Sequence, residues 1–320
     1  MDIEFLLAVG RFREATGHLL DGFMLFVSEL ISGVWVYPLV AAVYWCLDKK
    51  AGQRIALSVV GGLFVNQGLK NTFCVYRPWV RDPRVVPVGN AIETATGYSF
   101  PSGHTQIAVT MFGSLALWQR RRRWFSWVMV GLLCLVPISR VYLSVHTPQD
   151  VLVSLALAGL AIYASGKLLP WVETGKNRDL FLFFAGLVIC GLYLLYIELR
   201  PYPVDFAPDG QLLVDPEEMV QDCYSAAGCL VGFLSGWLLE RRCIRFTVPK
   251  EGKKRLLRLL VGAGVLLVIA VFLEAPFVLV FGANWGTFFR FTLAFFWVIA
   301  GAPRVFGLYE KRWFSCESIE

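Results

Sequence analysis

Long apolar stretches recur along the whole chain, and most approach the roughly 20 residues that an α-helix needs to cross a bilayer. Short charged or turn-forming segments separate them. The pattern predicts an all-α, polytopic bundle of about nine membrane-spanning helices, and residues 2–20 predict an amphipathic helix at the membrane interface. The expected spans are 22–47, 54–75, 103–118, 124–143, 148–171, 180–199, 219–239, 259–281 and 287–308.

Composition agrees with a membrane protein. The 320 residues are 57% hydrophobic and only 17% charged, against about 25% charged in soluble domains. Arg11, Arg13 and Glu14 interrupt the N-terminal apolar residues, so we expect no cleavable signal peptide and targeting by the first span. Eight scattered cysteines form no C-x-x-C pair and have no neighbouring histidine. They predict buried thiols rather than disulfides or a metal site.

Charge is distributed unevenly between the connections. The segments 48–54, 119–123, 173–179, 240–258 and 309–313 hold 19 of the 30 basic residues. The alternate connections, 76–102, 144–147, 200–218 and 282–286, hold few, so the positive-inside rule places the first set in the cytoplasm and the second outside. The net charge of +6 therefore reports topology, and nucleic-acid binding is not expected.

Ionisable residues inside apolar spans are costly and usually functional or paired. On the second span, Lys70 lies near the predicted outer end, and Arg77 follows two helical turns later. The third span begins with Pro101-Ser102-Gly103-His104 on the same side. Ser102 suits an N-cap and Gly103 permits close backbone approach, so this helix N-terminus predicts an anion site.

A third polar cluster lies between the fourth and fifth spans. Arg140 closes one span, Thr147 is a candidate cap for the next, and His146 and Asp150 are four residues apart. In that spacing the carboxylate can orient the imidazole as a nucleophile toward phosphorus. Taken singly, such residues fit bland roles as interfacial anchors or helix caps. Three clusters with complementary chemistry on one side favour a phosphate site.

The segments Lys70-x6-Arg77-Pro78, Pro101-Ser102-Gly103-His104 and Ser139-Arg140-x5-His146-x3-Asp150 resemble the three signature motifs of the type-2 phosphatidic acid phosphatase superfamily, over roughly residues 20–172. The resemblance implies a helical-bundle phosphohydrolase with no metal or other cofactor. In it, His146 would attack phosphorus, Asp150 would assist, and His104 would protonate the leaving group. The phosphate-binding residues would be Lys70, Arg77, Ser102, Gly103 and Arg140.

The chain is longer than compact bacterial members of that family. We expect an interfacial segment at 1–21, a phosphatase core of five to six helices at 22–172, and a four-span extension at 173–320. In the extension, Glu274 and Arg290 are expected to pair. The long loop 79–99, with Arg81 and Arg84, is a candidate lid, although ordinary solvated loop charges explain it equally well.

The leading hypothesis is a plasma-membrane lipid phosphate phosphatase whose site faces the extracytoplasmic side. Candidate substrates are phosphatidate, phosphatidylglycerol phosphate, undecaprenyl diphosphate and sphingoid phosphates. The alternatives are a lipid phosphotransferase of the same superfamily and a non-catalytic transport or structural protein. Haloperoxidases share this site chemistry, but the many spans disfavour that activity. The sequence leaves the lipid and the oligomeric state open.

Overall fold

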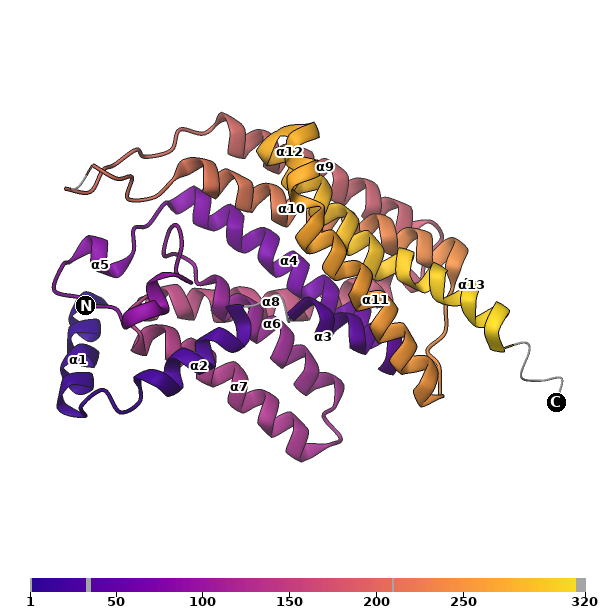
Figure 1. Ribbon diagram of the computed structural model, residues 1–320, viewed down its shortest axis with the longest axis horizontal. Helices are drawn as coiled ribbons and strands as arrows, with labels where there is room; N and C mark the ends of the chain where they lie inside the picture. Colours follow the sequence, from indigo (N-terminus) through magenta and orange to yellow (C-terminus); the bar gives the residue numbers. More distant parts are fainter. Residues whose placement is uncertain (1, 33–35, 209, 315–320) are drawn as a thin grey trace.

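The computed structural model describes residues 2–32, 36–208 and 210–314, and in that part of the chain every regular element is helical (Figure 1). The all-α prediction is therefore confirmed. The elements are α1 (Asp2–Ala15), α2 (Asp21–Ser32), α3 (Val36–Ala42), η1 (Val43–Leu47), α4 (Lys49–Phe73), α5 (Pro78–Arg81), η2 (Gly89–Ile92), α6 (Gly103–Trp118), α7 (Arg123–Tyr142), α8 (Pro148–Glu173), α9 (Arg178–Leu199), α10 (Pro216–Leu239), η3 (Glu240–Ile244), α11 (Gly252–Phe272), α12 (Glu274–Phe296), η4 (Trp297–Gly301) and α13 (Ala302–Phe314).

Six helical segments of the described chain are long and apolar enough to cross a membrane. The predicted number of nine is not confirmed. The helix α4 falls outside this set because its buried face carries Asn66, Lys70 and Asn71, and α6 has only 16 residues. The expected first span, 22–47, is divided among α2, α3 and η1, and its residues 33–35 lie outside the described chain.

The expected eighth span was wrong in extent. Instead of running from 259 to 281, α11 ends at Phe272, and α12 begins at Glu274. Proline at position 276 has no N–H to continue the α11 ladder. Within α12 the chain reverses at Gly282, whose φ of 77° lies in the left-handed region. The reversal is tight, since a methyl group on Gly286 would lie 2.7 Å from the carbonyl oxygen of Phe277.

The helix α4 forms the centre of the bundle, where it packs against α6, α8 and α10. The extension joins this core mainly through α10, which also packs against α9 and α12. Two glycines bring α10 and α12 together. A methyl group on Gly228 would lie 2.4 Å from the Phe288 carbonyl oxygen, and one on Gly232 would lie 2.3 Å from that of Thr292.

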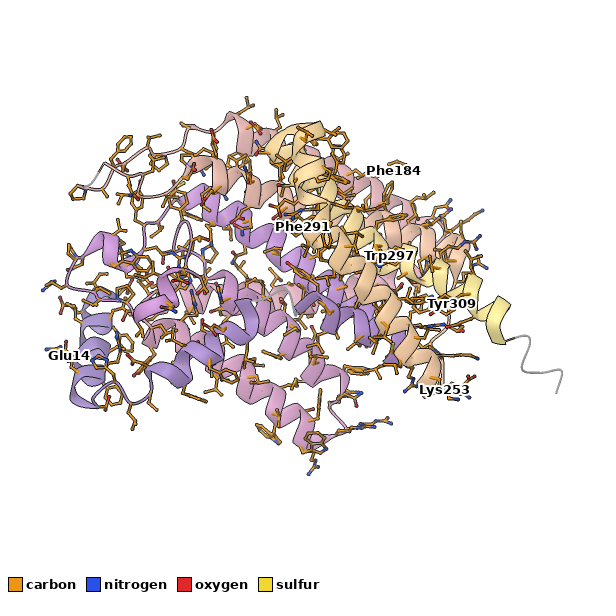
Figure 2. The ribbon with its side chains drawn as sticks, in the orientation of Figure 1. Glu14, Phe184, Lys253, Phe291, Trp297 and Tyr309 are labelled. Carbon is orange, nitrogen blue, oxygen red and sulfur yellow. The ribbon has the colours of Figure 1, made fainter. Side chains whose placement is uncertain are left out.

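Polar contacts tie the connections together at each end of the bundle. At one end, Lys49 binds Glu240 at 2.5 Å and Arg242 binds Asp179 at 2.7 Å, which joins three connections of the basic set. At the other end, on the left of Figure 1, Tyr76 Oη donates to Asp205 Oδ2 at 2.5 Å. Figure 2 shows Glu14 at this second end and Lys253 at the first. The contacting connections of the basic set thus lie at one end of the bundle, and those of the other set lie at the opposite end.

We predict that Gly232→Ala destabilises the protein by about 1–3 kcal/mol, because the added methyl group forces α10 and α12 apart. The matched control is Gly264→Ala in α11, where nothing lies within 4 Å of the added group. Thermal unfolding in detergent measures both. Equal melting temperatures for the two variants would contradict the packing described for α10 and α12.

Candidate active site

All eight residues singled out from the sequence lie at one end of the bundle. Lys70 interacts electrostatically with Arg77, Arg140 and Asp150. His104 interacts electrostatically with the cations Lys70, Arg77 and Arg140, and with His146. The backbone N–H of Ser102 donates to the Asp150 carbonyl oxygen at 3.3 Å, which joins the start of α6 to the start of α8. The ends of α4 and α7 and the starts of α6 and α8 therefore surround one polar site.

A tight turn between α7 and α8 positions His146. The turn passes through Ser144 in the left-handed region, at φ 60°, and the Val145 N–H donates to the Arg140 carbonyl at 3.2 Å. Thr147 then caps α8 in a capping box with Asp150. The His146 side chain is 1% exposed, so it points inward from this turn.

The Asp150 carboxylate fixes one edge of the imidazole. Its Oδ2 atom lies 3.3 Å from His146 Nδ1. The same oxygen accepts hydrogen bonds from the Thr147 backbone N–H at 2.8 Å and from Ser99 Oγ at 2.6 Å. An oxygen that accepts from several donors is held in place as an ionised acceptor. Asp150 therefore orients His146 from the first turn of the same helix.

Arg77 fixes the other edge of the ring. Its Nη1 atom lies 3.0 Å from His146 Nε2. A guanidinium donates hydrogen bonds and cannot accept them, so Nε2 must be the acceptor and Nδ1 must carry the proton. The tautomer thus follows from the two partners. The unprotonated nitrogen, Nε2, is the one that faces the cations.

The electrostatic surroundings keep this imidazole neutral. Burial lowers the pKa of His146, the positive charge of Arg77 lowers it further, and Asp150 opposes both effects. Arg77 itself is anchored, because Nε donates to the Gly97 carbonyl at 3.0 Å and Nη1 to that of Val145 at 3.0 Å. Its Nη2 atom donates to the Thr96 carbonyl at 2.6 Å. A lowered pKa leaves Nε2 available as a nucleophile at neutral pH.

The remaining cations have unused hydrogen-bonding capacity. Arg140 is completely buried and donates from Nη1 to Ser28 Oγ at 2.5 Å. Its Nε and Nη2 atoms are buried without a partner among the described residues. Lys70 is also buried, at 6% exposure, and its Nζ atom has no hydrogen bond or salt bridge to any described residue. Buried donors of this kind are normally satisfied, and an anion satisfies several at once.

The N-terminus of α6 adds backbone donors. Ser102 is its N-cap, and its Oγ accepts from the Thr105 N–H at 3.4 Å. The first N–H groups of an α-helix have no intrahelical acceptor, so those of Gly103 and His104 are available to a ligand. The His104 Nε2 atom is buried without a partner in the described chain. The site can therefore hold a phosphate by charge, by side-chain donors and by backbone donors together.

Several contributors were missed by sequence reasoning. Ser28 on α2 and Thr94 in the loop both contact Arg140 Nη1, at 2.5 and 3.3 Å. Ser99 binds Asp150, and the carbonyls of Thr96 and Gly97 hold Arg77. A single serine or threonine carries no spacing signal, and a carbonyl carries no residue-specific signal. These contacts depend on packing between segments that are remote in sequence.

The loop 79–99 packs against the bundle. Its residues Val85, Val88, Ala91 and Ala95 are buried, and the Val88 N–H donates to the Leu143 carbonyl at 3.2 Å. Arg84, by contrast, lies at the surface beside Asp82 at 2.7 Å. The guanidinium of Arg84 lowers the pKa of Asp82 through a side-chain hydrogen bond. This pairing favours the solvated-charge interpretation of Arg84.

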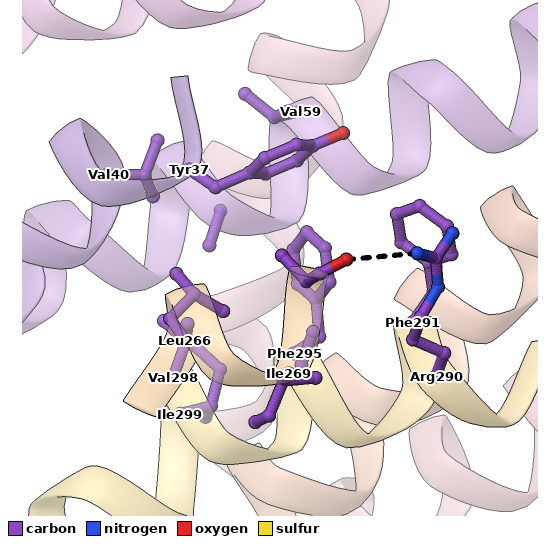
Figure 3. A pocket seen from close by; sticks show the side chains of 13 residues that line it. Tyr37, Val40, Val59, Leu266, Ile269, Arg290, Phe291, Phe295, Val298 and Ile299 are labelled. Atoms are coloured by element: carbon purple, nitrogen blue, oxygen red, sulfur yellow. Dashed lines mark hydrogen bonds between the residues drawn. The ribbon is translucent and has the colours of Figure 1, made fainter. Parts of the chain in front are cut away.

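The predicted pair of Glu274 and Arg290 is present, at 2.5 Å. Glu274 precedes the reversal at Gly282 and Arg290 follows it, so the pair joins the two helical parts of α12. Arg290 lies beside an apolar cavity of about 250 Å³ between α3, α4, α11 and α12, where it also donates to the Ala270 carbonyl at 3.1 Å (Figure 3). Apart from Tyr37 the rest of the lining is apolar, and Arg290 is already paired with Glu274 and the Ala270 carbonyl. This cavity is not a phosphate site.

A separate apolar groove of about 690 Å³ runs between α1, α7 and α8. Tyr142, Pro148 and Val151 line it, and they flank the turn that carries His146. The polar site and an apolar groove therefore adjoin the same turn. Among the described residues, no group of three or more His, Cys, Asp or Glu side chains is placed to hold a metal ion.

Two protein-family models match this chain, one in each half. Residues 52–172 match the model of the PAP2 superfamily. Residues 224–311 match that of the transmembrane extension of PAP2 superfamily phosphatases. YbjG of Escherichia coli K12 is 31% identical over 149 residues, which are 45% of this chain and 71% of the relative. The chain belongs to the PAP2 superfamily.

Other PAP2 relatives carry informative names. The undecaprenyl-diphosphatase BcrC of Bacillus subtilis is 29% identical over 162 residues, 48% of this chain and 79% of the relative. The lipid A 4'-phosphatase of Porphyromonas gingivalis is 28% identical over 153 residues, 43% of this chain and 61% of the relative. No solved structure matches the chain significantly. The protein is thus a multi-pass membrane lipid phosphatase of the PAP2 family.

We predict that the His146 ring of the ligand-free protein stays neutral between pH 5.5 and 7.5. Its pKa is lowered, so protonation occurs only at more acidic pH than the ordinary value of about 6.5. Nitrogen-15 NMR of histidine-labelled protein, with His146→Gln to assign the signal, measures this. A titration midpoint near 6.5 would contradict the geometry around Arg77.

Proposed function

We propose that this PAP2 protein hydrolyses a lipid diphosphate or phosphomonoester at the extracytoplasmic face of the plasma membrane, through a phosphohistidine on His146 and without a metal. Undecaprenyl diphosphate is the leading substrate, since the relative BcrC carries that activity in its name. One observation carries the proposal. The lone pair on His146 Nε2 faces a cluster of cations at the N-terminus of α6.

In the first step, His146 Nε2 attacks phosphorus, and the bond from phosphorus to the leaving oxygen breaks. The electron pair of that bond stays on the leaving oxygen, which takes a proton from His104. The negative charge of the bound phosphate stabilises the protonated form of His104 against burial and the neighbouring cations. Arg77 exchanges its hydrogen bond to Nε2 for one to a phosphoryl oxygen. Asp150 stabilises the cationic imidazole through Nδ1.

In the second step, water attacks phosphorus and the bond to Nε2 breaks, which restores the electron pair to His146. The water proton passes to His104, so the enzyme returns to its starting state with inorganic phosphate released. Lys70, Arg140 and the backbone N–H of Gly103 hold the phosphoryl oxygens in both steps. Catalysis then depends on positioning and charge stabilisation, as phosphoryl transfer allows.

The apolar groove between α1, α7 and α8 is proposed to accept the hydrocarbon chain of the lipid. Its position beside the turn that carries His146 supports this. We also propose that residues 1–21, 22–172 and 173–320 act as interfacial segment, phosphatase core and extension. The matched ranges 52–172 and 224–311 fit within the last two.

We expect His146→Ala to lower phosphate release from undecaprenyl diphosphate at least about 1,000-fold, because it removes the nucleophile. Orthovanadate should inhibit the wild type as a mimic of the five-coordinate phosphorus, and a chelator should not inhibit it. Phosphate release by purified protein in detergent measures each effect. Unchanged activity in His146→Ala would contradict the mechanism, and label that appears in a second lipid would favour phosphotransfer over hydrolysis.

The proposed orientation makes a separate prediction. Sealed right-side-out vesicles should hydrolyse a water-soluble, short-chain prenyl diphosphate without detergent, because the site opens to the outside. Inverted vesicles should need detergent for the same activity. The reverse result would contradict the extracytoplasmic site and leave the chemistry of His146 unaffected.

A further inference from the structure

Asn66 on α4 has a buried side-chain amide whose polar atoms no described residue satisfies. Its side chain is completely buried, and neither Nδ2 nor Oδ1 has a hydrogen-bond partner among the described residues. Burying an unsatisfied amide is unfavourable, and native proteins rarely leave one without a partner. None of the three family motifs includes this residue. The donor and the acceptor of this amide are therefore available to a bound water or ligand.

The position of Asn66 identifies where that partner lies. Gly62, Asn66 and Lys70 are spaced by four residues, so they share one face of α4. That face packs against α6, since a methyl group on Gly62 would lie 2.6 Å from the side-chain amide of Gln106. A methyl group on Gly103 would lie 3.9 Å from Asn66 Oδ1. The amide thus lies beside the first residue of α6, one turn below Lys70.

We propose that Asn66 is a further phosphate-binding residue, whose Nδ2–H donates to a phosphoryl oxygen shared with Lys70 and the Gly103 N–H. This inference rests on the proposed phosphatase function. The amide group can turn its donating end toward the anion, because no partner in the described chain fixes which end faces Gly103. A neutral N–H donor fixes the position of one phosphoryl oxygen without adding positive charge to the site.

The same position is sensitive to negative charge. An aspartate at residue 66 would have the same size as asparagine. Its negative charge would repel the phosphoryl oxygens that the cations of the site bind. Asn66→Asp should therefore impair the site more than Asn66→Ala, which only removes the donor. A purely structural amide gives no reason for the isosteric variant to be the worse of the two for anion binding.

The experiment compares Asn66→Ala and Asn66→Asp with Ser58→Ala in full-length protein. Ser58 is also completely buried on α4, and its partners, Ser114 and the Ile55 carbonyl, lie away from the site. Three quantities are measured: kcat and KM for phosphate release from undecaprenyl diphosphate, the inhibition constant of orthovanadate, and the melting temperature with and without orthovanadate.

We expect Asn66→Ala to lower kcat by about 100- to 1,000-fold, in the range of a lost oxyanion donor, and to raise the orthovanadate inhibition constant at least about tenfold. Asn66→Asp should exceed both effects and abolish the rise in melting temperature that orthovanadate gives the wild type. Ser58→Ala should match the wild type in kcat and in orthovanadate inhibition.

Wild-type orthovanadate inhibition constants in both Asn66 variants would overturn the inference, as would an equal loss in Ser58→Ala. If Asn66→Asp does not fold, Asn66→Ala decides. Failure of the proposed function has a different signature, since the wild type itself would then release no phosphate from any lipid. The orthovanadate-dependent melting temperature still tests Asn66 in that case.

Discussion

The site depends on the hydrogen bonds of a single guanidinium. Arg77 donates to the carbonyls of Thr96, Gly97 and Val145 and to His146 Nε2, so it joins the loop before α6 to the turn before α8. Because an arginine cannot accept a hydrogen bond, the same contact selects the tautomer of the histidine. Loop geometry and the protonation of the nucleophile are therefore set together, before any substrate binds.

The extension is part of this arrangement through α10. Met219 packs so closely on Gly97 that a methyl group there would lie 2.2 Å from Met219 Cε. The Gly97 carbonyl is one of those that anchor Arg77. Met219 on α10 therefore packs against a residue that holds Arg77 in place. Asp222 on the same helix interacts electrostatically with Lys70 and lies 3.4 Å from Gln67. A carboxylate and a packing residue from outside the phosphatase core thus adjoin the site.

Sequence patterns predicted the features that local chemistry determines. The start of α6 at Gly103, the Thr147 cap and the approach of His146 to Asp150 all follow from residue type and short spacing. Features that depend on packing were not predictable. Ser28 and Asn66 gain their roles from helices that meet only in the fold. The end of α11 did have a local signal, since Glu274 and Pro276 follow Leu273 closely.

The central claim is that His146 Nε2 forms a covalent bond to phosphorus during turnover. The most direct measurement is a rapid quench of wild-type protein with undecaprenyl diphosphate labelled in its terminal phosphate, followed by alkaline digestion and peptide mapping. We predict an acid-labile, base-stable label on His146 that disappears at the rate of phosphate release. Turnover with no label on His146, or with label on another residue, would contradict the account.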